Sequence, residues 1–235
     1  ELNTLVLQFK NTTLAGFLFL TAGNGCVVFA LKYIESGFAS LLISSQPLIL
    51  LIMLKILQKQ NIKLRSIMGA FLGILGIVLL TYSQGIAGEI SWIGVGLVMS
   101  SLIYWGYGSI FVGTAVLPKN QFVNSAYQMI TGGLMLLVLS KTTGENSTNL
   151  RELDVKAIGS MTFLIVFGSI IAFTSFNYLL QKVPPEKVAT GTYVNPVVAV
   201  ILGYLVLNET LAPIRILASA IVLAGVYFIN SAKSK

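Results

Sequence analysis

The sequence predicts an all-α membrane protein, a polytopic bundle of eight transmembrane helices. Hydrophobic residues make up 55% of the 235 residues and charged residues only 10%, whereas soluble domains carry roughly 25% charged residues. The charged residues leave long charge-free runs, most of them near the roughly 20 residues that a helix needs to cross a bilayer core. These runs show no period of two, so a β-barrel is not expected. Helices then satisfy every backbone polar group in lipid.

Charged residues bound each expected span, and the connections between spans are short. The spans are 11–31 (between Lys10 and Lys32), 36–54 (Glu35 and Lys55), 66–88 (Arg65 and Glu89), 90–118 (Glu89 and Lys119), 120–140 (Lys119 and Lys141), 157–181 (Lys156 and Lys182), 188–208 (Lys187 and Glu209) and 216–232 (Arg215 and Lys233). The longest connection, 141–156, is polar, and we expect it to be exposed.

The connections predict the orientation of the chain in the membrane. Taken alternately, the connections and termini place ten Lys and Arg residues on one side and five on the other. Because cytoplasmic segments carry the excess of Lys and Arg, the first side is expected to face the cytoplasm. That side includes the segment 55–65 and the C-terminus. The expected location is the plasma membrane, which in bacteria is the inner membrane.

An internal repeat becomes visible when the chain is aligned with itself at an offset of 149 residues. No gap is needed from about residue 14 to residue 82, and Pro47 then aligns with Pro196 and Gly76 with Gly225. Weak internal symmetry of this kind is typical of transporters.

The repeat predicts the domain organisation. Two further spans precede the second copy, so its unit, residues 89–235, has five helices. An odd number of helices requires two successive units to be inverted in the membrane. The first unit, residues 1–88, shows only three. We therefore expect a five-plus-five architecture whose first two helices precede Glu1.

The two matched prolines indicate helix kinks near mid-membrane. Proline removes a backbone hydrogen bond and clashes with the preceding turn, and each proline follows an amide, Gln46 before Pro47 and Asn195 before Pro196. Kinked helices free polar groups to face a cavity at the repeat interface. Bending for helix packing alone is the alternative interpretation.

Polar and aromatic residues that helical spacing places on shared faces complete the candidate site. The predicted solute-binding residues are Asn24, Gln46, Tyr104, Tyr107, Asn177, Thr192, Tyr193 and Asn195. Each of them could instead form interhelical hydrogen bonds. Gln128 adds another mid-span amide.

Several classes of function are not expected. The chain has no His, a single Cys26 and no charged residue inside a span, so we predict no metal site, no cofactor and no catalytic centre. No basic run with interleaved aromatic residues indicates nucleic-acid binding. The spacings Gly69-x-x-x-Gly73 and Ala220-x-x-x-Ala224 permit close helix contact, either between the repeats or between subunits of a homodimer.

Two segments resemble the EamA repeats of the drug/metabolite transporter superfamily. They are "ALKYIESGFASLLISSQPLILLIMLKIL" with "RSIMGAFLGILGIVLL", and "LLQKVPPEKVATGTYVNPVVAVILGYLVLNETLAPIRILASAIVLAGVYFI". The resemblance implies ten helices, cytoplasmic termini and a cavity among the first, third, fourth, sixth, eighth and ninth helices. Two features depart from the family pattern: Asn195 stands where members often have an acidic residue, and "QKQN" at 58–61 replaces a common "GE".

The expected function is therefore transport of a small organic solute by alternating access. A metabolite, an amino acid or a drug-like compound would be moved, with export as the expected direction, and membrane lipids would surround the protein. Two alternatives remain: a flippase for lipids or lipid-linked sugars from the same superfamily, and a membrane subunit that transports nothing.

Overall fold

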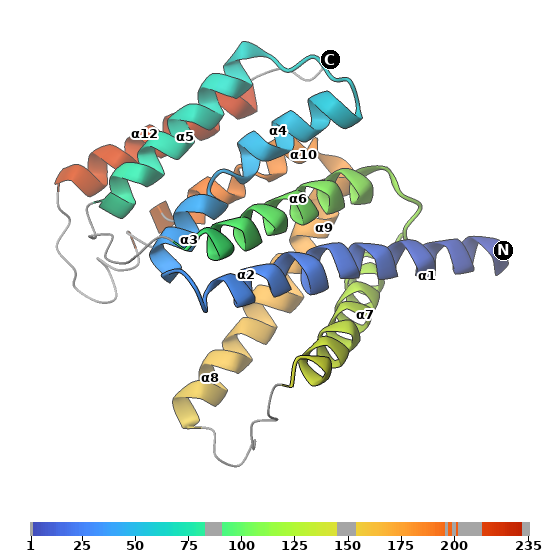
Figure 1. The fold of residues 1–235 in the computed structure, drawn as a ribbon. Coiled ribbons are helices and arrows are strands. Elements are labelled where there is room, and N and C mark those ends of the chain that lie inside the picture. Colours follow the sequence, from blue (N-terminus) through green and yellow to red (C-terminus); the bar gives the residue numbers. More distant parts are fainter. Residues whose placement is uncertain are drawn as a thin grey trace. The chain divides into compact units, whose positions relative to one another are not determined.

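The computed structural model describes residues 2–82, 91–144, 154–195, 197–198, 201 and 213–231. Within these residues every regular element is a helix, as the composition predicts (Figure 1). The helices are α1 (Leu2–Gly16), η1 (Phe17–Asn24), α2 (Gly25–Ala30), α3 (Ser36–Ile43), α4 (Gln46–Leu57), α5 (Leu64–Tyr82), α6 (Trp92–Thr114), α7 (Gln121–Thr142), α8 (Val155–Phe163), η3 (Leu164–Phe173), α9 (Thr174–Lys182), α10 (Pro185–Val188) and α12 (Pro213–Ser231).

Among the described residues, four continuous helices are long and apolar enough to cross a membrane: Leu2–Ala30, Trp92–Thr114, Gln121–Thr142 and Val155–Lys182. Shorter apolar helices occur in α4, α5 and α12. The first long helix begins at Leu2, earlier than the predicted residue 11. The predicted span 36–54 is divided into α3 and α4.

Two of the long helices contain a π-helical segment at their centre. Residues Phe17–Asn24 form η1 and residues Leu164–Phe173 form η3. π-helical turns are rare and occur often at functional sites. The sequence carries no signal that predicts them.

The chain divides into two compact units. Unit 1 comprises residues 1–25 and 108–182, and unit 2 comprises residues 26–107 and 183–235. Each unit takes segments from both predicted repeats, 1–88 and 89–235. The repeat boundary itself stays a prediction.

In unit 1, α7 is the central helix. It contacts α1 and η1 from one part of the chain, and η3 and α9 from another. Small residues bring these helices close together, since a methyl group added at Gly132 would lie 2.8 Å from the Gly16 carbonyl oxygen. Asn120 caps the N-terminus of α7, because its side chain accepts hydrogen bonds from the backbone N–H groups of Phe122 and Val123.

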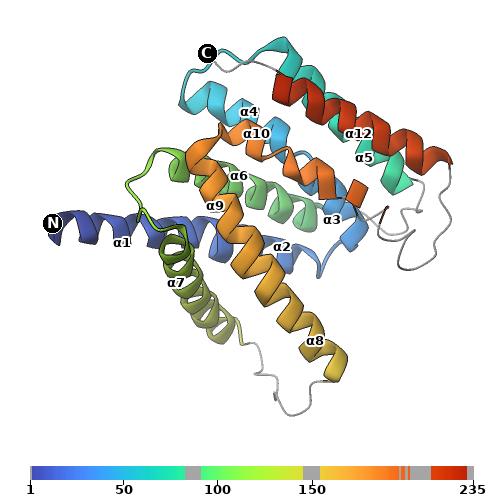
Figure 2. The ribbon, with the colours of Figure 1, turned by 180° about the vertical axis from the view of Figure 1, so that it is seen from behind.

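In unit 2, α5 and α12 form the closest helix pair and lie side by side in both ribbon views (Figures 1 and 2). A methyl group added at Gly69 would lie 2.6 Å from the Gly225 carbonyl oxygen, and one added at Gly76 would lie 2.9 Å from the Ala218 carbonyl oxygen. The two helices are therefore antiparallel. The buried cluster around them contains Leu51, Ala70, Ile77, Tyr193, Val197, Ala218, Val222 and Ile229.

This contact corrects one detail of the small-residue prediction. Gly69 and Gly73 do lie at a close helix contact, but their neighbours on α12 are Gly225 and, for Gly69, Ile229. Ala220 is exposed, so the predicted Ala220-x-x-x-Ala224 spacing does not make the contact. The contact lies within one chain.

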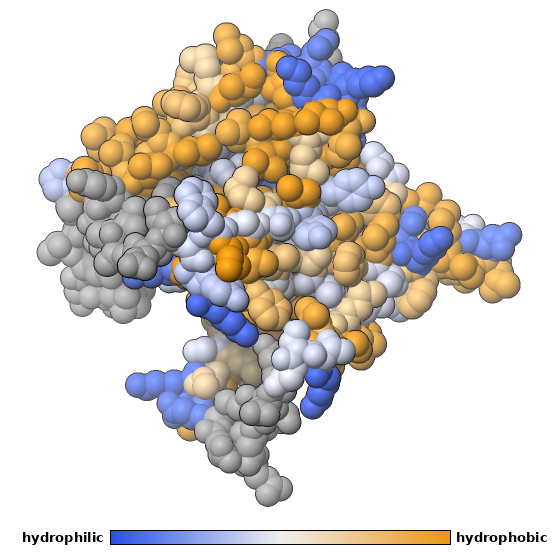
Figure 3. Space-filling view, in the orientation of Figure 1, coloured by the Kyte–Doolittle hydropathy of each residue, from blue (hydrophilic) through white to orange (hydrophobic). Residues whose placement is uncertain are grey.

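Hydrophobic side chains cover much of the molecular surface, as expected for a protein surrounded by lipid. Figure 3 shows them along the helices, while hydrophilic side chains gather at the turn between α4 and α5 and at the beginning of α8. Many large apolar residues are strongly exposed, for example Phe71 at 68% and Leu164 at 62%. Exposure of this extent marks a surface that contacts lipid or protein.

Candidate functional site

A helix break separates α3 from α4. Helix α3 ends at Ile43, residues 44–45 form a turn, and α4 begins at Gln46 with Pro47 in its first turn. Because Pro47 has no N–H group, the carbonyl of Ile43 loses its normal helical donor. The chain turns more tightly here than in an α-helix, because the N–H of Ser45 donates a hydrogen bond to the Leu42 carbonyl, three residues earlier, at 3.0 Å.

Gln46 places an unpaired amide at this break. Its side chain is only 9% exposed, and within the described residues it has no hydrogen-bond partner. A methyl group added at Gly106 of α6 would lie 3.5 Å from Gln46 Nε2. The Gln46 amide therefore lies next to Gly106 of α6, the residue that precedes Tyr107.

The two predicted tyrosines of α6 lie at different depths in unit 2. Tyr107 is 44% exposed, and Tyr104 is half-buried. The structure thus brings Gln46 and the Tyr107 segment together.

The predicted residues between 192 and 196 differ in their burial. Tyr193 is completely buried, and its hydroxyl donates a hydrogen bond to the Ala70 carbonyl at 2.9 Å. Its ring lies against Gly73. Asn195 is exposed and Thr192 is half-buried. Pro196 lies outside the described residues.

The predicted residues of unit 1 also differ in burial. Asn24, at the end of η1, is exposed. Asn177 is completely buried, and its amide joins a hydrogen-bonded network.

This amide network links α7 to α9 and consists of Gln121, Asn124, Gln128, Asn177 and Gln181. Gln128 Nε2 donates to Asn124 Oδ1 and to Asn177 Oδ1, both at 3.0 Å. Asn124 Nδ2 donates to Gln121 Oε1 at 3.4 Å, and Gln121 Nε2 donates to Gln181 Oε1 at 2.7 Å. Hydrogen bonds between amides on neighbouring helices are a common way to join membrane helices.

One backbone carbonyl determines how the central amides are oriented. Asn177 Nδ2 donates to the Phe173 carbonyl at 3.1 Å, and a carbonyl can only accept. Asn177 Oδ1 must therefore face Gln128, and Gln128 must present its N–H groups to it. Gln128 Oε1 is left buried and without a partner among the described residues.

Asn177 and Gln128 are both recognisable from the sequence as polar residues within spans, but their pairing was not predicted. Asn124 and Gln128 are four residues apart on α7, and Asn177 and Gln181 are four apart on α9. Two helices with amides at the same spacing could have signalled an interhelical network.

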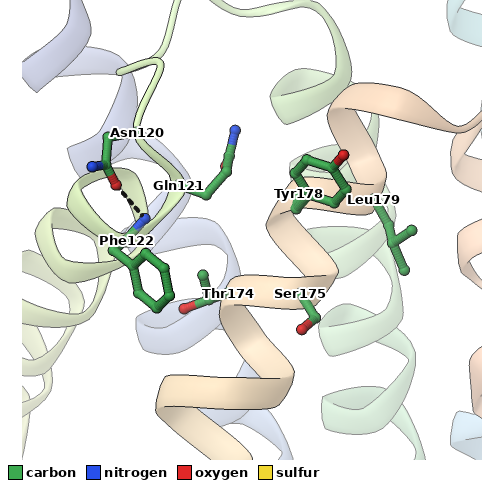
Figure 4. Close-up of a pocket in the computed structure, with 7 residues that line it drawn as sticks. All are labelled: Asn120, Gln121, Phe122, Thr174, Ser175, Tyr178 and Leu179. Atoms are coloured by element: carbon green, nitrogen blue, oxygen red, sulfur yellow. Dashed lines mark hydrogen bonds between the residues drawn. The ribbon is translucent and has the colours of Figure 1, made fainter.

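A groove of about 550 Å³ opens between the beginning of α7 and α9, and we call it the α7–α9 groove. It is lined by the capping residue Asn120, by Gln121 and Phe122 of α7, and by Thr174, Ser175, Tyr178 and Leu179 of α9. Figure 4 shows Asn120 and Phe122 on the left of the view and Ser175, Tyr178 and Leu179 of α9 on the right. None of its lining residues belonged to the predicted site.

The described residues contain no group of three His, Cys, Asp or Glu side chains that could hold a metal ion. The side chains at the helix break and in the amide network are neutral. They can bind a solute by hydrogen bonds and by contact with aromatic rings.

Comparison with known proteins decides the family. Residues 3–82 and 92–231 match the model of the EamA-like transporter family. The chain belongs to the EamA-like transporter family. This EamA-like chain is 33% identical to YedA of Escherichia coli (strain K12), an uncharacterised inner membrane transporter, over 225 residues that cover 95% of the chain and 71% of YedA.

Other relatives of this EamA-like transporter carry similar descriptions. An uncharacterised transporter of Synechocystis sp. is 29% identical over 89% of this chain and 68% of its own length. A crystal structure at 17% identity has a TM-score of 0.71 and covers 96% of this chain and 89% of its own, which shows the likeness of the fold. The protein is thus an integral membrane transporter, and its family points to transport rather than catalysis.

Proposed function

We propose that this transporter moves a small organic solute across the membrane by alternating access. The observation that carries the proposal is the break between α3 and α4, where the nearly buried amide of Gln46 lacks a partner among the described residues. Discontinuous helices near mid-membrane form the solute sites of many transporters. An amide without a protein partner has its donors and its acceptor available for hydrogen bonds to a ligand.

The neutral lining defines the class of solute. No Asp, Glu, Lys or Arg lies within the predicted spans, so amides, hydroxyls and aromatic rings would make the contacts. Such groups suit a polar or amphipathic organic molecule. The proposed contacts in unit 2 are Gln46, Tyr104, Tyr107, Thr192 and Asn195. Asn24, which belongs to unit 1, stays a prediction.

Two of the predicted site residues take structural roles in the proposal. The hydroxyl of Tyr193 is bonded to the Ala70 carbonyl. The amide of Asn177 is bonded to Gln128 and to the Phe173 carbonyl. Because these polar atoms already have partners inside the protein, we assign Tyr193 and Asn177 to helix packing.

We further propose that the chain contains the two inverted repeats of a five-plus-five transporter. The offset of 149 residues relates Gly69 to Ala218 and Gly76 to Gly225. In the structure, each glycine of α5 contacts the counterpart of the other glycine: Gly69 contacts Gly225, and Gly76 contacts Ala218. A pseudo-twofold axis produces this kind of exchange.

The π-helical segments support the same repeat. Shifted by 149 residues, η1 (17–24) falls on residues 166–173, which lie inside η3 (Leu164–Phe173). In the proposed topology eight helices cross the membrane, the C-terminus lies in the cytoplasm, and the direction of transport is export. A homodimer stays a prediction.

Accessibility of position 46 tests alternating access. In a Cys26→Ser background, we would introduce Gln46→Cys and treat vesicles from one side at a time with a membrane-impermeant thiol reagent. We expect labelling from each side, and slower labelling when a transported solute is present. Gln60→Cys, exposed in the connection after α4, is the matched control, and solute should not protect it. Labelling of the Gln46→Cys variant from one side only, with or without solute, would contradict alternating access.

A further inference from the structure

The α7–α9 groove has the volume of a ligand-binding site. Its volume of about 550 Å³ lies in the range of roughly 300–1,000 Å³ that is usual for ligand sites. It lies at the first turn of α7 and along α9, which ends at Lys182. The hydrogen bond between Gln121 and Gln181 at 2.7 Å holds these two helix ends together.

The lining of the groove is amphipathic. Phe122 is 68% exposed and Leu179 is 42% exposed, so both present apolar surface. Thr174, Ser175 and Tyr178 supply three hydroxyl groups that have no hydrogen-bond partner among the described residues. In Figure 4, Phe122 and Tyr178 stand on opposite sides with Thr174 between them.

Positive charge flanks the groove. Lys119 precedes the capping residue Asn120, and Lys182 lies four residues after Tyr178 on the same face of α9. Both lysines lie outside the buried core. The only carboxylate in the described part of unit 1 is Asp154, at the beginning of the 28-residue helix that Lys182 ends. A helix of that length spans about 42 Å, so this carboxylate is far from the groove.

These features match the parts of an anionic phospholipid. We propose that the groove binds such a lipid, with Lys119 and Lys182 at its phosphate. The hydroxyls of Ser175 and Tyr178 donate hydrogen bonds to the ester carbonyls, which can only accept, and an acyl chain lies against Phe122 and Leu179. Basic pockets between transmembrane helices bind anionic headgroups in this way, and tyrosine is enriched at the membrane interface.

The cap of α7 makes the lysines essential to this site. Asn120 already accepts from the N–H groups of Phe122 and Val123, so these donors are not free for an anion. Binding of the phosphate therefore depends on the charges of Lys119 and Lys182. The apolar side chains of Phe122 and Leu179 require an acyl chain as their partner. The lipid site is independent of the transported solute.

Thermal unfolding of the purified protein in mild detergent tests the proposal. We would add dioleoyl-phosphatidylglycerol, dioleoyl-phosphatidylcholine or glycerol 3-phosphate to the wild type, to Lys119→Gln/Lys182→Gln and to Lys141→Gln/Lys156→Gln. The last pair removes two lysines of unit 1 at the end of α7 and the beginning of α8. We expect only phosphatidylglycerol to raise the midpoint, and its apparent affinity to fall about tenfold in Lys119→Gln/Lys182→Gln alone.

Three results would overturn the lipid site. They are an equal response to phosphatidylcholine, an equal response in both double variants, and a response to glycerol 3-phosphate alone, which would indicate a site for a soluble anion. If the first double variant does not fold, Tyr178→Phe and Ser175→Ala decide the question. Each should weaken the response to phosphatidylglycerol and leave the lipid-free midpoint unchanged, and an unchanged response in both would also overturn the site.

Discussion

Gln128 Nε2 donates a hydrogen bond to Asn177 Oδ1 at 3.0 Å, and both side chains are completely buried. This bond ties α7 to α9 at the centre of unit 1. The same nitrogen also donates to Asn124, so one amide satisfies two buried acceptors. Lipid offers no alternative partners for these groups.

Replacement of Gln128 by Met should therefore destabilise the protein. The change keeps an unbranched side chain but leaves the carbonyl oxygens of Asn124 and Asn177 without this donor. We expect a loss of about 1–3 kcal/mol in the free energy of unfolding. Equilibrium unfolding in mixed micelles would measure it, with the exposed Gln60→Met as the control. Equal stability of both variants would mean that the network contributes nothing.

Tyr193 is predicted to act through packing. Tyr193→Phe removes the bond to the Ala70 carbonyl and should cost about 0.5–1.5 kcal/mol. Tyr193→Ala also leaves a cavity beside Gly73 and should cost about 3–5 kcal/mol. Tyr227→Phe, at a residue that is 69% exposed, is the control. If Tyr193→Phe abolishes solute binding at unchanged stability, the assignment to packing is wrong.

Replacement of glycine by alanine should have opposite effects on stability at Gly69 and at Gly96. A methyl group at Gly69 would lie 2.6 Å from the Gly225 carbonyl oxygen, whereas one at Gly96 has nothing within 4 Å. Gly69→Ala must separate α5 from α12 and should cost about 1–3 kcal/mol. Gly96→Ala should keep or raise the stability, because alanine favours a helix by about 1 kcal/mol over glycine. Thermal midpoints of the two variants would reveal the sign, and a matching loss in both would contradict the close contact.

Asn195→Ala should lower solute flux without loss of folded protein. The side chain is exposed, so its removal leaves no cavity in the core, whereas a solute would lose one amide contact. Flux per folded molecule is the measurement, and the amount of protein in the membrane controls for folding. Unchanged flux would remove Asn195 from the proposed site.

The helical architecture could be predicted from the sequence because charged residues bound the apolar runs. Pro47 indicated a kink within the span 36–54, because a residue without an N–H cannot continue the α-helical bonding, whereas the structure has two separate helices there. Helical spacing places Tyr193 and Asn195 on a helix but does not say which neighbour covers each of them. The ring of Tyr193 packs against Gly73, whereas Asn195 is exposed. Such differences depend on tertiary packing.

The same limit explains the features that the sequence did not reveal. Gln128 and Asn177 are 49 residues apart, and only the contact between α7 and α9 brings them together. Gly69 meets Gly225 and Ile229 rather than Ala220, because the crossing of the two helices determines which face of α12 lies against α5.

Solute flux in proteoliposomes tests the central claim most directly. We would compare the wild type with Gln46→Leu, and with the exposed Gln60→Leu as the matched control, against a panel of labelled amino acids, sugars and cationic drugs. We predict saturable flux of one solute class in the wild type and in Gln60→Leu, and at least about a tenfold loss in Gln46→Leu, which corresponds to about 1.4 kcal/mol. Saturable flux that is equal in all three proteins would contradict the role of the helix break. Absence of flux for every solute in folded protein would contradict solute transport itself.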